Sequence, residues 1–217
     1  FINPYPFNSQ AGQRFKFEQH YGKLRFNDYS IRTNSFFDMN TYLILYKKHN
    51  TLNKVIGTIK GYIRRVFLIF NLRNYDYLYV HMWVVPFGGP LFEKIYRFFG
   101  KKLIYDFEDN ILSLNNYHYN SISDILRKKN KIVYLIKNYD NIITSSKYLE
   151  LKSNEISKKN NCKYICASID TKRFNVRKNH IKKDVVNIGW TGTYTTIKYL
   201  KLFEKTLFEI NKIRKIK

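Results

Sequence analysis

The chain has 217 residues, which is enough for one complete α/β domain and part of a second. Its 39 Lys and Arg residues against 16 Asp and Glu residues give a formal net charge of +23, which disfavours acidic partners and favours polyanions and anionic membranes. The longest apolar run, Val66–Phe70, is far too short to span a bilayer, and no segment resembles a signal peptide. Coding bias is an alternative source of the charge, since AT-rich codons specify the abundant Lys, Asn, Ile and Tyr residues. We expect a cytoplasmic protein.

Apolar residues alternate along the chain between short strand-like runs and longer helical runs. Residues 1–3 have the pattern of a strand end, and a loop then leads into a helix that carries Arg14. A short β-branched alternation at residues 29–33 indicates another strand. Further strands are predicted at residues 77–80, 102–105, 141–144 and 163–166, and helices at residues 51–71, 91–99, 123–138 and 147–159. This order predicts an α/β fold, with a parallel sheet that has helices on both faces and right-handed crossovers.

Residues 51–71 carry apolar side chains at helical spacing, with Lys60, Arg64 and Arg65 on other faces of the helix. Many of the 19 Tyr and 17 Phe residues of the chain lie on such apolar stripes, and we expect these stripes to pack in the core. Stacking on nucleic-acid bases is the alternative use of aromatic side chains on a basic surface. The sequence contains no nucleic-acid recognition signature, so core packing is the better interpretation.

The composition changes near residue 170, where Lys and Arg become frequent and apolar residues rare, as is typical of a solvated linker. A new strand is predicted from Val185, followed by a polar turn and a helix that begins near Ile197. The predicted organisation is a first domain at residues 1–174, a basic linker at residues 175–184 and the start of a second α/β unit at residues 185–217. Because the chain opens on Phe1 and stops inside a helical pattern, we expect a fragment cut at both ends.

Cysteine and histidine spacing gives no pattern for a metal site or a catalytic nucleophile. Cys162 and Cys166 have no further Cys or His close enough in sequence to complete a zinc site. The five histidines are scattered, at His20, His49, His81, His118 and His180. We predict reduced thiols and no bound metal.

In open α/β sheets, ligands bind at the carboxyl ends of the strands, and three features fall at such positions. The first is the opening loop, residues 8–13. Gly12 lets the backbone approach a ligand closely, and amides at the start of the helix favour an anion or a sugar hydroxyl. The GxGxxG and GxxxxGK nucleotide loops are absent from the sequence. An ordinary capped turn is the alternative interpretation.

The second feature is the set of carboxylates Asp106, Glu108 and Asp109, which directly follows a predicted strand in an acid-poor chain. They could bind hydroxyls, hold a metal, or act as acid or base. Helix capping and charge balance against Lys101 and Lys102 are the alternative. The third feature is a turn at residues 189–193, whose glycines and threonines suit an anion.

These loops, in this order, resemble those of the group 1 glycosyltransferases of the GT-B fold. The matching stretches cover nearly the whole chain. They are PYPFNSQAGQRFKFEQHY at residues 4–21, SFFD at 35–38, PFGGPLFEK at 86–94, GKKLIYDFEDNI at 100–111, ITSSKYL at 143–149, SIDTKRF at 168–174 and IGWTGTYTTIKYL at 188–200. The combination is far more specific than any one stretch.

The resemblance implies two Rossmann-like domains that face each other across a cleft, the first for the acceptor and the second for a nucleotide sugar, with a retaining transfer between them. Residues 1–174 would be the N-terminal domain, and residues 185–217 the first βα unit of the second. The residues implied to contact the donor or its phosphates are Gly12, Gln13, Arg14, Gly192 and Thr193. The carboxylates of Asp106, Glu108 and Asp109 would be catalytic. Apart from the nucleotide sugar as co-substrate, no cofactor and no metal are implied.

We therefore expect a glycosyltransferase that transfers a sugar to a glycan or lipid-linked acceptor in cell-envelope polysaccharide synthesis, peripheral to the inner membrane face. The basic segment 51–71 would suit an anionic membrane surface. Three departures stand against the family pattern: the EX7E element does not occur, Met82–Trp83 replace an Arg-Glu pair, and Glu108 stands where Asp is more usual. The alternatives are a basic nucleic-acid-binding protein and an inactive glycosyltransferase remnant. The fragment itself is expected to be inactive.

Overall fold

The computed structural model describes residues 1–108, 129–171, 174, 185–192 and 196–217. The chain divides into two compact units, Phe1–Asp170 and Thr171–Lys217. The predicted domain and linker boundaries remain predictions. Within the described residues, no helix combines the length and the apolar character that crossing a membrane requires.

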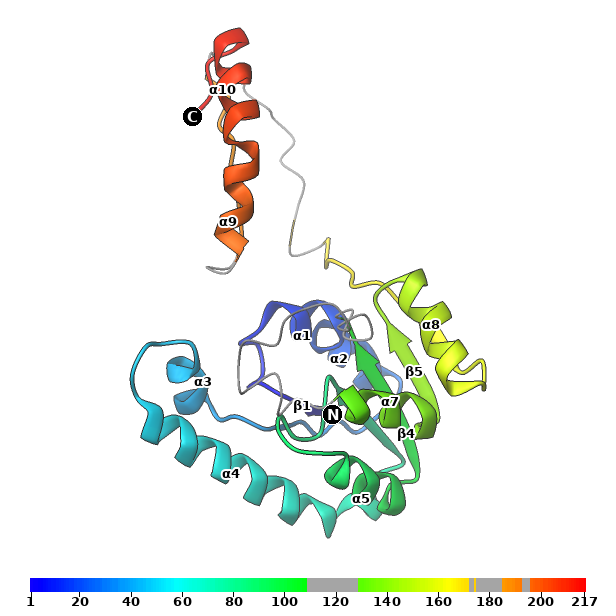
Figure 1. Ribbon diagram of the computed structural model, residues 1–217. Coiled ribbons are helices and arrows are strands. Elements are labelled where there is room, and N and C mark those ends of the chain that lie inside the picture. Colours follow the sequence, from blue (N-terminus) through cyan, green and yellow to red (C-terminus); the bar gives the residue numbers. More distant parts are fainter. Residues whose placement is uncertain (109–128, 172–173, 175–184, 193–195) are drawn as a thin grey trace. The chain divides into compact units, whose positions relative to one another are not determined.

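The first unit is built on one sheet of six parallel strands (Figure 1), which confirms the predicted Rossmann-like α/β class. Its order is β2-β1-β3-β4-β5-β6. The strands are β1 Ile2–Asn3, β2 Asn34–Ser35, β3 Tyr77–His81, β4 Lys102–Phe107, β5 Asn141–Thr144 and β6 Cys162–Tyr164. From β1 the chain moves to one side to form β2 and then to the other side to form β3. The carboxyl ends of β1 and β3 therefore flank a topological switch point, where open sheets of this type bind ligands.

Helices and single turns connect the strands of the first unit. They are α1 Ala11–Lys16, η1 Glu18–His20, α2 Tyr21–Phe26, α3 Met39–Leu45, α4 Thr51–Ile69, η2 Leu72–Asn74, α5 Leu91–Phe99, α7 Lys129–Asn138 and α8 Lys147–Ser157. Side chains cap three of them at the amino end, because Gln10, Asp38 and Ser146 each accept a hydrogen bond from a first-turn amide. The predicted helix at 123–138 is described only from Lys129 onward.

In the first unit, two local predictions differ from the structure. Residues 29–33 form no strand, and the pairing with β1 is made just beyond them by β2, where Asn34 lies opposite Ile2. The stripe on α4 does not enter the core. Instead α4 packs through Gly57, Gly61 and the buried Arg65, together with the partly buried Tyr62, Leu68 and Ile69, while the side chains of the stripe are exposed. Glycine allows this close packing, since a Cβ at Gly61 would lie 2.6 Å from the Phe36 ring.

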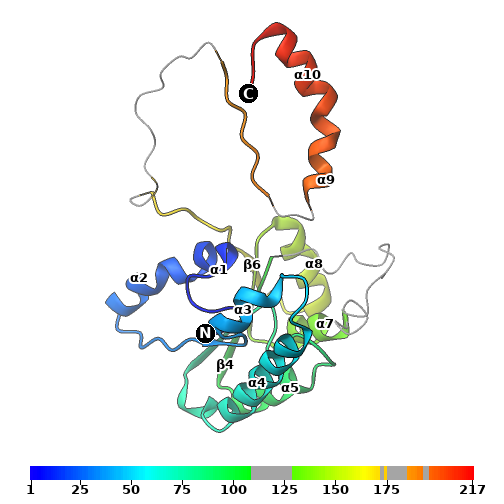
Figure 2. The same ribbon diagram turned by 90° about the vertical axis from the view of Figure 1, so that its left-hand side faces the viewer.

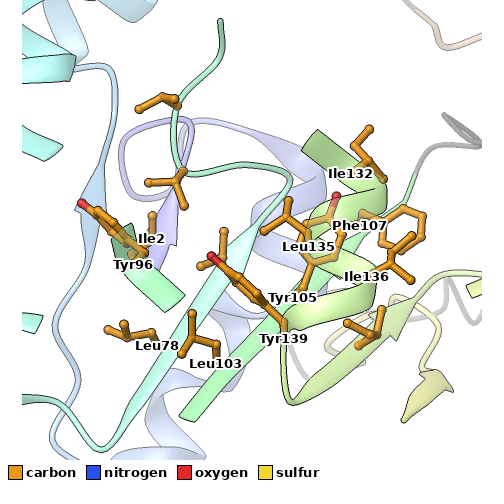
Figure 3. Packing of buried hydrophobic residues seen from close by; sticks show 14 of the residues in the cluster. Ile2, Leu78, Tyr96, Leu103, Tyr105, Phe107, Ile132, Leu135, Ile136 and Tyr139 are labelled. Atoms are coloured by element: carbon orange, nitrogen blue, oxygen red, sulfur yellow. The ribbon is translucent and has the colours of Figure 1, made fainter. Parts of the chain in front are cut away.

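The core of the first unit lies where β3, β4 and β5 meet α5 and α7 (Figure 3). Tyr105 and Phe107 point from β4 toward Leu135 and Ile136 of α7, and all four side chains are buried. The rings of Tyr105 and Phe107 stack, with their centroids 5.1 Å apart. Burial of this kind supplies most of the favourable free energy of folding. It also makes β4 a rigid support for the residues at its carboxyl end.

The second unit contains α9 Ile197–Leu200, η5 Lys201–Phe203 and α10 Glu204–Ile213. The strand predicted from Val185 does not form in the described residues 185–192, where Val186 makes only an isolated parallel bridge with Ile216. The bridge is joined by hydrogen bonds from the Val186 amide to the Lys215 carbonyl at 3.0 Å and from the Lys217 amide to the Val186 carbonyl at 3.0 Å.

Candidate functional site

The buried side chain of Gln13 holds the opening loop in place through hydrogen bonds. Its Nε2 donates to the Tyr5 carbonyl and its Oε1 accepts from the Tyr5 amide, both at 3.0 Å. The same Nε2 donates to Glu18 Oε1 at 3.1 Å, and Glu18 Oε2 accepts from the Asn8 amide at 2.9 Å. Asn8 adopts a left-handed backbone with φ of 62°. Gln13 of α1 and Glu18 of η1 thus hold the loop in one conformation.

Gly12 brings this loop against the carboxyl end of β4. A Cβ at Gly12 would lie 3.3 Å from Glu108 Oε2 and 2.9 Å from Gln10 Oε1. On its other side, the Glu108 carbonyl accepts a hydrogen bond from Ser145 Oγ at 2.9 Å. Segments that follow β1, β4 and β5 therefore meet at Glu108. The absence of a side chain at Gly12 is what leaves room for the Glu108 carboxylate.

Asp106, which lies in β4 two residues before Glu108, is the centre of a buried polar cluster. Its Oδ1 lies 3.0 Å from Lys16 Nζ, and both side chains are almost wholly excluded from solvent. The Tyr79 hydroxyl donates to Asp106 Oδ2, and His81 Nδ1 lies 3.8 Å from the same oxygen. Lys16 Nζ also donates to the Ile165 carbonyl at 3.1 Å. The cluster joins the opening helix to two central strands and to the segment after β6.

Burial shifts the pKa values of Tyr79 and His81, the two β3 residues of this cluster. It lowers the pKa of His81 to about 4, against an opposing effect of the Asp106 carboxylate. Burial and the same carboxylate raise the pKa of the Tyr79 hydroxyl well above its ordinary value. His81 is therefore a neutral imidazole at physiological pH. Its Nδ1 has no hydrogen-bond partner among the residues that the structure describes.

Met82 forms a strained turn where β3 ends. Its φ of 64° lies in the left-handed region, which non-glycine residues rarely occupy. The Trp83 amide donates to the His81 carbonyl at 2.8 Å across this turn, and the Met82 amide donates to the Asp106 carbonyl at 2.8 Å. Such strain persists where the surrounding structure holds it, often at ligand sites. Met82 and Trp83 therefore lie at the same sheet edge as Asp106.

The structure brings together three of the predicted site residues, Gly12, Asp106 and Glu108. Gln13 is buried and supports the loop, while Arg14 is half-buried and its Nη1 lies 3.5 Å from the Asn8 carbonyl. Asp109 and Thr193 lie outside the described residues. Gly192 belongs to the second unit, where a Cβ would collide with the Trp190 ring.

The two cysteines both lie in the described part of the chain, and neither forms a disulfide there. Cys162 is buried and Cys166 exposed, and both are free thiols. In that part of the chain, no group of three or more His, Cys, Asp or Glu side chains is placed to hold a metal ion.

Sequence reasoning missed three members of the buried cluster, Lys16, Tyr79 and His81. A signal for Lys16 was its place between Phe15 and Phe17, where a charged residue interrupts an aromatic segment. For His81 the sequence carries no such signal. The strand register sets it opposite Asp106, and that register is a property of the folded sheet.

The fold and these polar residues define the class of protein: a Rossmann-like α/β domain with a candidate polar site at the carboxyl edge of its sheet. Comparison with known proteins does not narrow this class, because neither a family model nor a curated protein matches the chain.

Proposed function

We propose that the chain supplies the acceptor-side domain of a glycosyltransferase, which transfers a sugar from a nucleotide-sugar donor to a glycan or lipid-linked acceptor in cell-envelope polysaccharide synthesis. The observation that carries this proposal is the approach of Glu108 to Gly12 at the carboxyl edge of the sheet. A carboxylate beside bare backbone can accept hydrogen bonds from sugar hydroxyls while the backbone amides bind the same ligand. The motif resemblance described above supports the same class.

Within this proposal, Asp106 in β4 and Glu108 just after it have different roles. Asp106 is fully buried and paired with Lys16, so it positions the site and does not contact the sugar. Glu108 is only half-buried and belongs to the loop edge, so it is the residue that holds the acceptor hydroxyl. The transfer breaks the bond from the anomeric carbon to the diphosphate oxygen and forms a bond from that carbon to the acceptor oxygen, while the nucleoside diphosphate leaves and takes up the acceptor's hydroxyl proton.

The donor diphosphate is assigned to basic and backbone groups. Within the first unit, Arg14 supplies positive charge beside the backbone of Gly12, where it can offset part of the diphosphate charge. The phosphate-binding roles of Gly192 and Thr193 stay predictions from the resemblance. Retention of the anomeric configuration follows from the resemblance and is part of the proposal.

The proposal is tested by titrating the isotope-labelled chain with UDP-glucose, GDP-mannose and a short oligosaccharide, and recording amide chemical shifts. We expect the Gly12 and Glu108 amides to shift with at least one of these ligands. Glu108→Gln should weaken that response about tenfold, because it removes a charged acceptor. Glu155→Gln, an exposed carboxylate on α8, is the matched control and should leave it unchanged.

Two results would contradict the proposal. One is that no nucleotide sugar or oligosaccharide shifts either amide. The other is that duplex DNA binds with an affinity that falls steeply with salt while sugars have no effect, which would favour the nucleic-acid-binding alternative.

A further inference from the structure

The carboxyl edge of the sheet carries aromatic residues beside the polar site. Phe37 follows β2, Tyr5 follows β1 and Trp83 follows β3, and these three strands are neighbours in the sheet. The next strand in the order, β4, leads instead to Glu108. Because the strands are parallel, their carboxyl ends lie along one edge of the sheet. That edge therefore changes from aromatic to acidic along its length.

Ring contacts join these residues to helix α3. Tyr5 stacks on the buried Phe37 with ring centroids 6.2 Å apart, and Tyr42 of α3 meets Tyr5 edge-on at 5.5 Å. Trp83 packs edge-on against Phe37 at 6.5 Å. Phe37 thus anchors an aromatic cluster in which Tyr5 and Tyr42 are only half-buried.

Helix α3 brings two tyrosines to the opening loop. The Tyr42 hydroxyl donates to the Ser9 carbonyl at 2.8 Å, and the hydroxyl oxygens of Tyr46 and Tyr5 lie 3.0 Å apart. Tyr46 directly follows α3 and is 77% exposed. Figure 2 shows α3 facing the viewer, just below α1. We call Tyr5, Tyr42 and Tyr46 the tyrosine shelf, and it borders the same loop that approaches Glu108.

The tyrosine shelf has the chemistry of a sugar-binding surface. Each tyrosine offers an apolar ring and a polar hydroxyl. A pyranose ring has the complementary parts, with C–H groups on its faces and hydroxyls around its rim. A hydrocarbon chain would instead cover the exposed hydroxyls of Tyr5 and Tyr46 without forming hydrogen bonds to them, which costs free energy. The shelf therefore suits a sugar better than a lipid chain.

We infer that the tyrosine shelf binds the second sugar of an acceptor glycan, the ring next to the one whose hydroxyl meets Glu108. Aromatic surface with a few placed polar groups is the usual composition of a small-molecule site. The inference rests on the proposed function and narrows it, because it selects a glycan of at least two sugar units over a lipid chain as the group that the first unit recognises.

The test is an NMR titration of the 217-residue chain with ¹³C-labelled tyrosine rings. The probes are three pairs: glucose and cellotetraose, N-acetylglucosamine and chitotriose, and mannose and mannotriose. We expect at least one oligosaccharide to shift the ring signals of Tyr42 and Tyr46. It should bind at least about tenfold more tightly than its monosaccharide, because only the longer ligand reaches both Glu108 and the shelf. Tyr42→Phe and Tyr46→Phe assign the ring signals.

Variants of Tyr46 separate binding from folding. Tyr46→Ala should lower the preference for that oligosaccharide over its monosaccharide about fivefold, because it removes an exposed ring that contacts the second sugar. Tyr46→Phe keeps the ring and should lower the preference about twofold. A general loss of structure would weaken both ligands together and leave the preference unchanged, and circular dichroism checks that each variant is folded. The control is Tyr148→Ala, which changes a 51% exposed tyrosine on α8 and should bind like the parent chain.

Three results would overturn the inference. One is that no oligosaccharide shifts the ring signals of Tyr42 or Tyr46, and another is that Tyr46→Ala keeps the parent chain's preference. The third is that UDP or farnesyl phosphate shifts these signals while the oligosaccharides do not, since the shelf would then bind a nucleotide base or a lipid chain.

The same titration distinguishes this inference from the proposed function. If the Gly12 and Glu108 amides respond to a nucleotide sugar but the tyrosine rings respond to no oligosaccharide, the inference fails alone. If the rings respond to an oligosaccharide but neither amide responds to any ligand, the proposed function fails and the shelf is a glycan-binding surface of another kind.

Discussion

Arg65 and Lys16 are both buried cations, but they have different kinds of partner. Arg65 donates only to neutral groups: Nε to the Val84 carbonyl at 2.8 Å, Nη2 to the Asn3 carbonyl at 3.0 Å, and Nη1 to the Asn34 carbonyl at 2.9 Å. Burial lowers the pKa of Arg65 to about 10, so it keeps its charge at neutral pH. Its donors tie the short strands β1 and β2 to the segment that follows β3.

Lys16 instead faces the carboxylate of Asp106, with Tyr79 and His81 on the other oxygen. All the acceptors of Arg65 are neutral oxygens, whereas Lys16 faces a carboxylate that two titratable side chains also approach. The Lys16 cluster joins α1, the helix behind the opening loop, to Asp106, which lies two residues before Glu108. The comparison teaches that two buried cations can differ in kind, because Lys16 has a carboxylate and titratable partners and Arg65 has neutral acceptors only.

The largest effect is expected from Arg65→Met. This change leaves three backbone carbonyls without their donor, and each buried unsatisfied group costs about 1–3 kcal/mol. We expect the free energy of unfolding to fall by about 3–5 kcal/mol, measured by urea titration followed by Trp83 fluorescence and circular dichroism. Arg73→Met is the control, because Arg73 is exposed, and it should change stability by less than about 1 kcal/mol. Equal effects of the two substitutions would remove the structural role of Arg65.

Asp106→Asn comes next in expected size. It leaves the buried ammonium of Lys16 without its counter-charge, so we expect a loss of about 2–4 kcal/mol in the same urea titration. The double variant Lys16→Met/Asp106→Asn should be less destabilised than the sum of the two single variants, because it removes both charges together. Additive effects in this cycle would show that the two side chains do not interact, and the comparison with Arg65 would fail.

The sequence was sufficient for the features that depend on local pattern. The apolar runs at 77–80, 102–105 and 141–144 predicted β3, β4 and β5. The carboxylates after residue 105 suggested a candidate site at the end of β4, and its function stays a prediction. Apart from Asp106, the members of the buried cluster were not predicted, because their proximity depends on how β3, β4 and α1 come together. The orientation of α4 was also missed. Periodicity shows that a helix has an apolar face, but not which face is covered, and Gly57 and Gly61 were the available signal for close packing.

His81 allows a test through pH. Its folded-state pKa of about 4 lies below its ordinary value of 6.5, so the unfolded chain binds the proton more tightly. Stability from neutral His81 is complete above about pH 6.5 and is lost as the pH falls toward 4. Relative to His81→Gln, the parent chain should lose about 2–3 kcal/mol over this range.

The difference between parent and variant isolates His81 from the carboxyls of Glu18 and Glu93, whose pKa values burial raises in both proteins. The charged and titratable groups that face the imidazole are Asp106, Lys16 and Tyr79. A difference that does not vary with pH would show that His81 is not held neutral beside them.

The smallest stability effect, and the most informative about the site, is expected from Gly12→Ala. Gly12 lies in the first turn of α1, where alanine is favoured over glycine by up to about 1 kcal/mol. Against this, the new Cβ would crowd Gln10 Oε1 at 2.9 Å and Glu108 Oε2 at 3.3 Å. The net change should be within about 1 kcal/mol of zero.

Gly22→Ala in α2 is the matched control, because no atom lies within 4 Å of its Cβ position. It should stabilise the chain by about 0.5–1 kcal/mol. If Gly12→Ala stabilises as much and leaves the response of the Glu108 amide to nucleotide sugars unchanged, the loop does not approach Glu108 in a way that matters for binding. If stability hardly changes but that response is lost, the contact between loop and carboxylate serves the ligand and not the fold. The site below Glu108 then differs from the Arg65 cluster in function as well as in its partners.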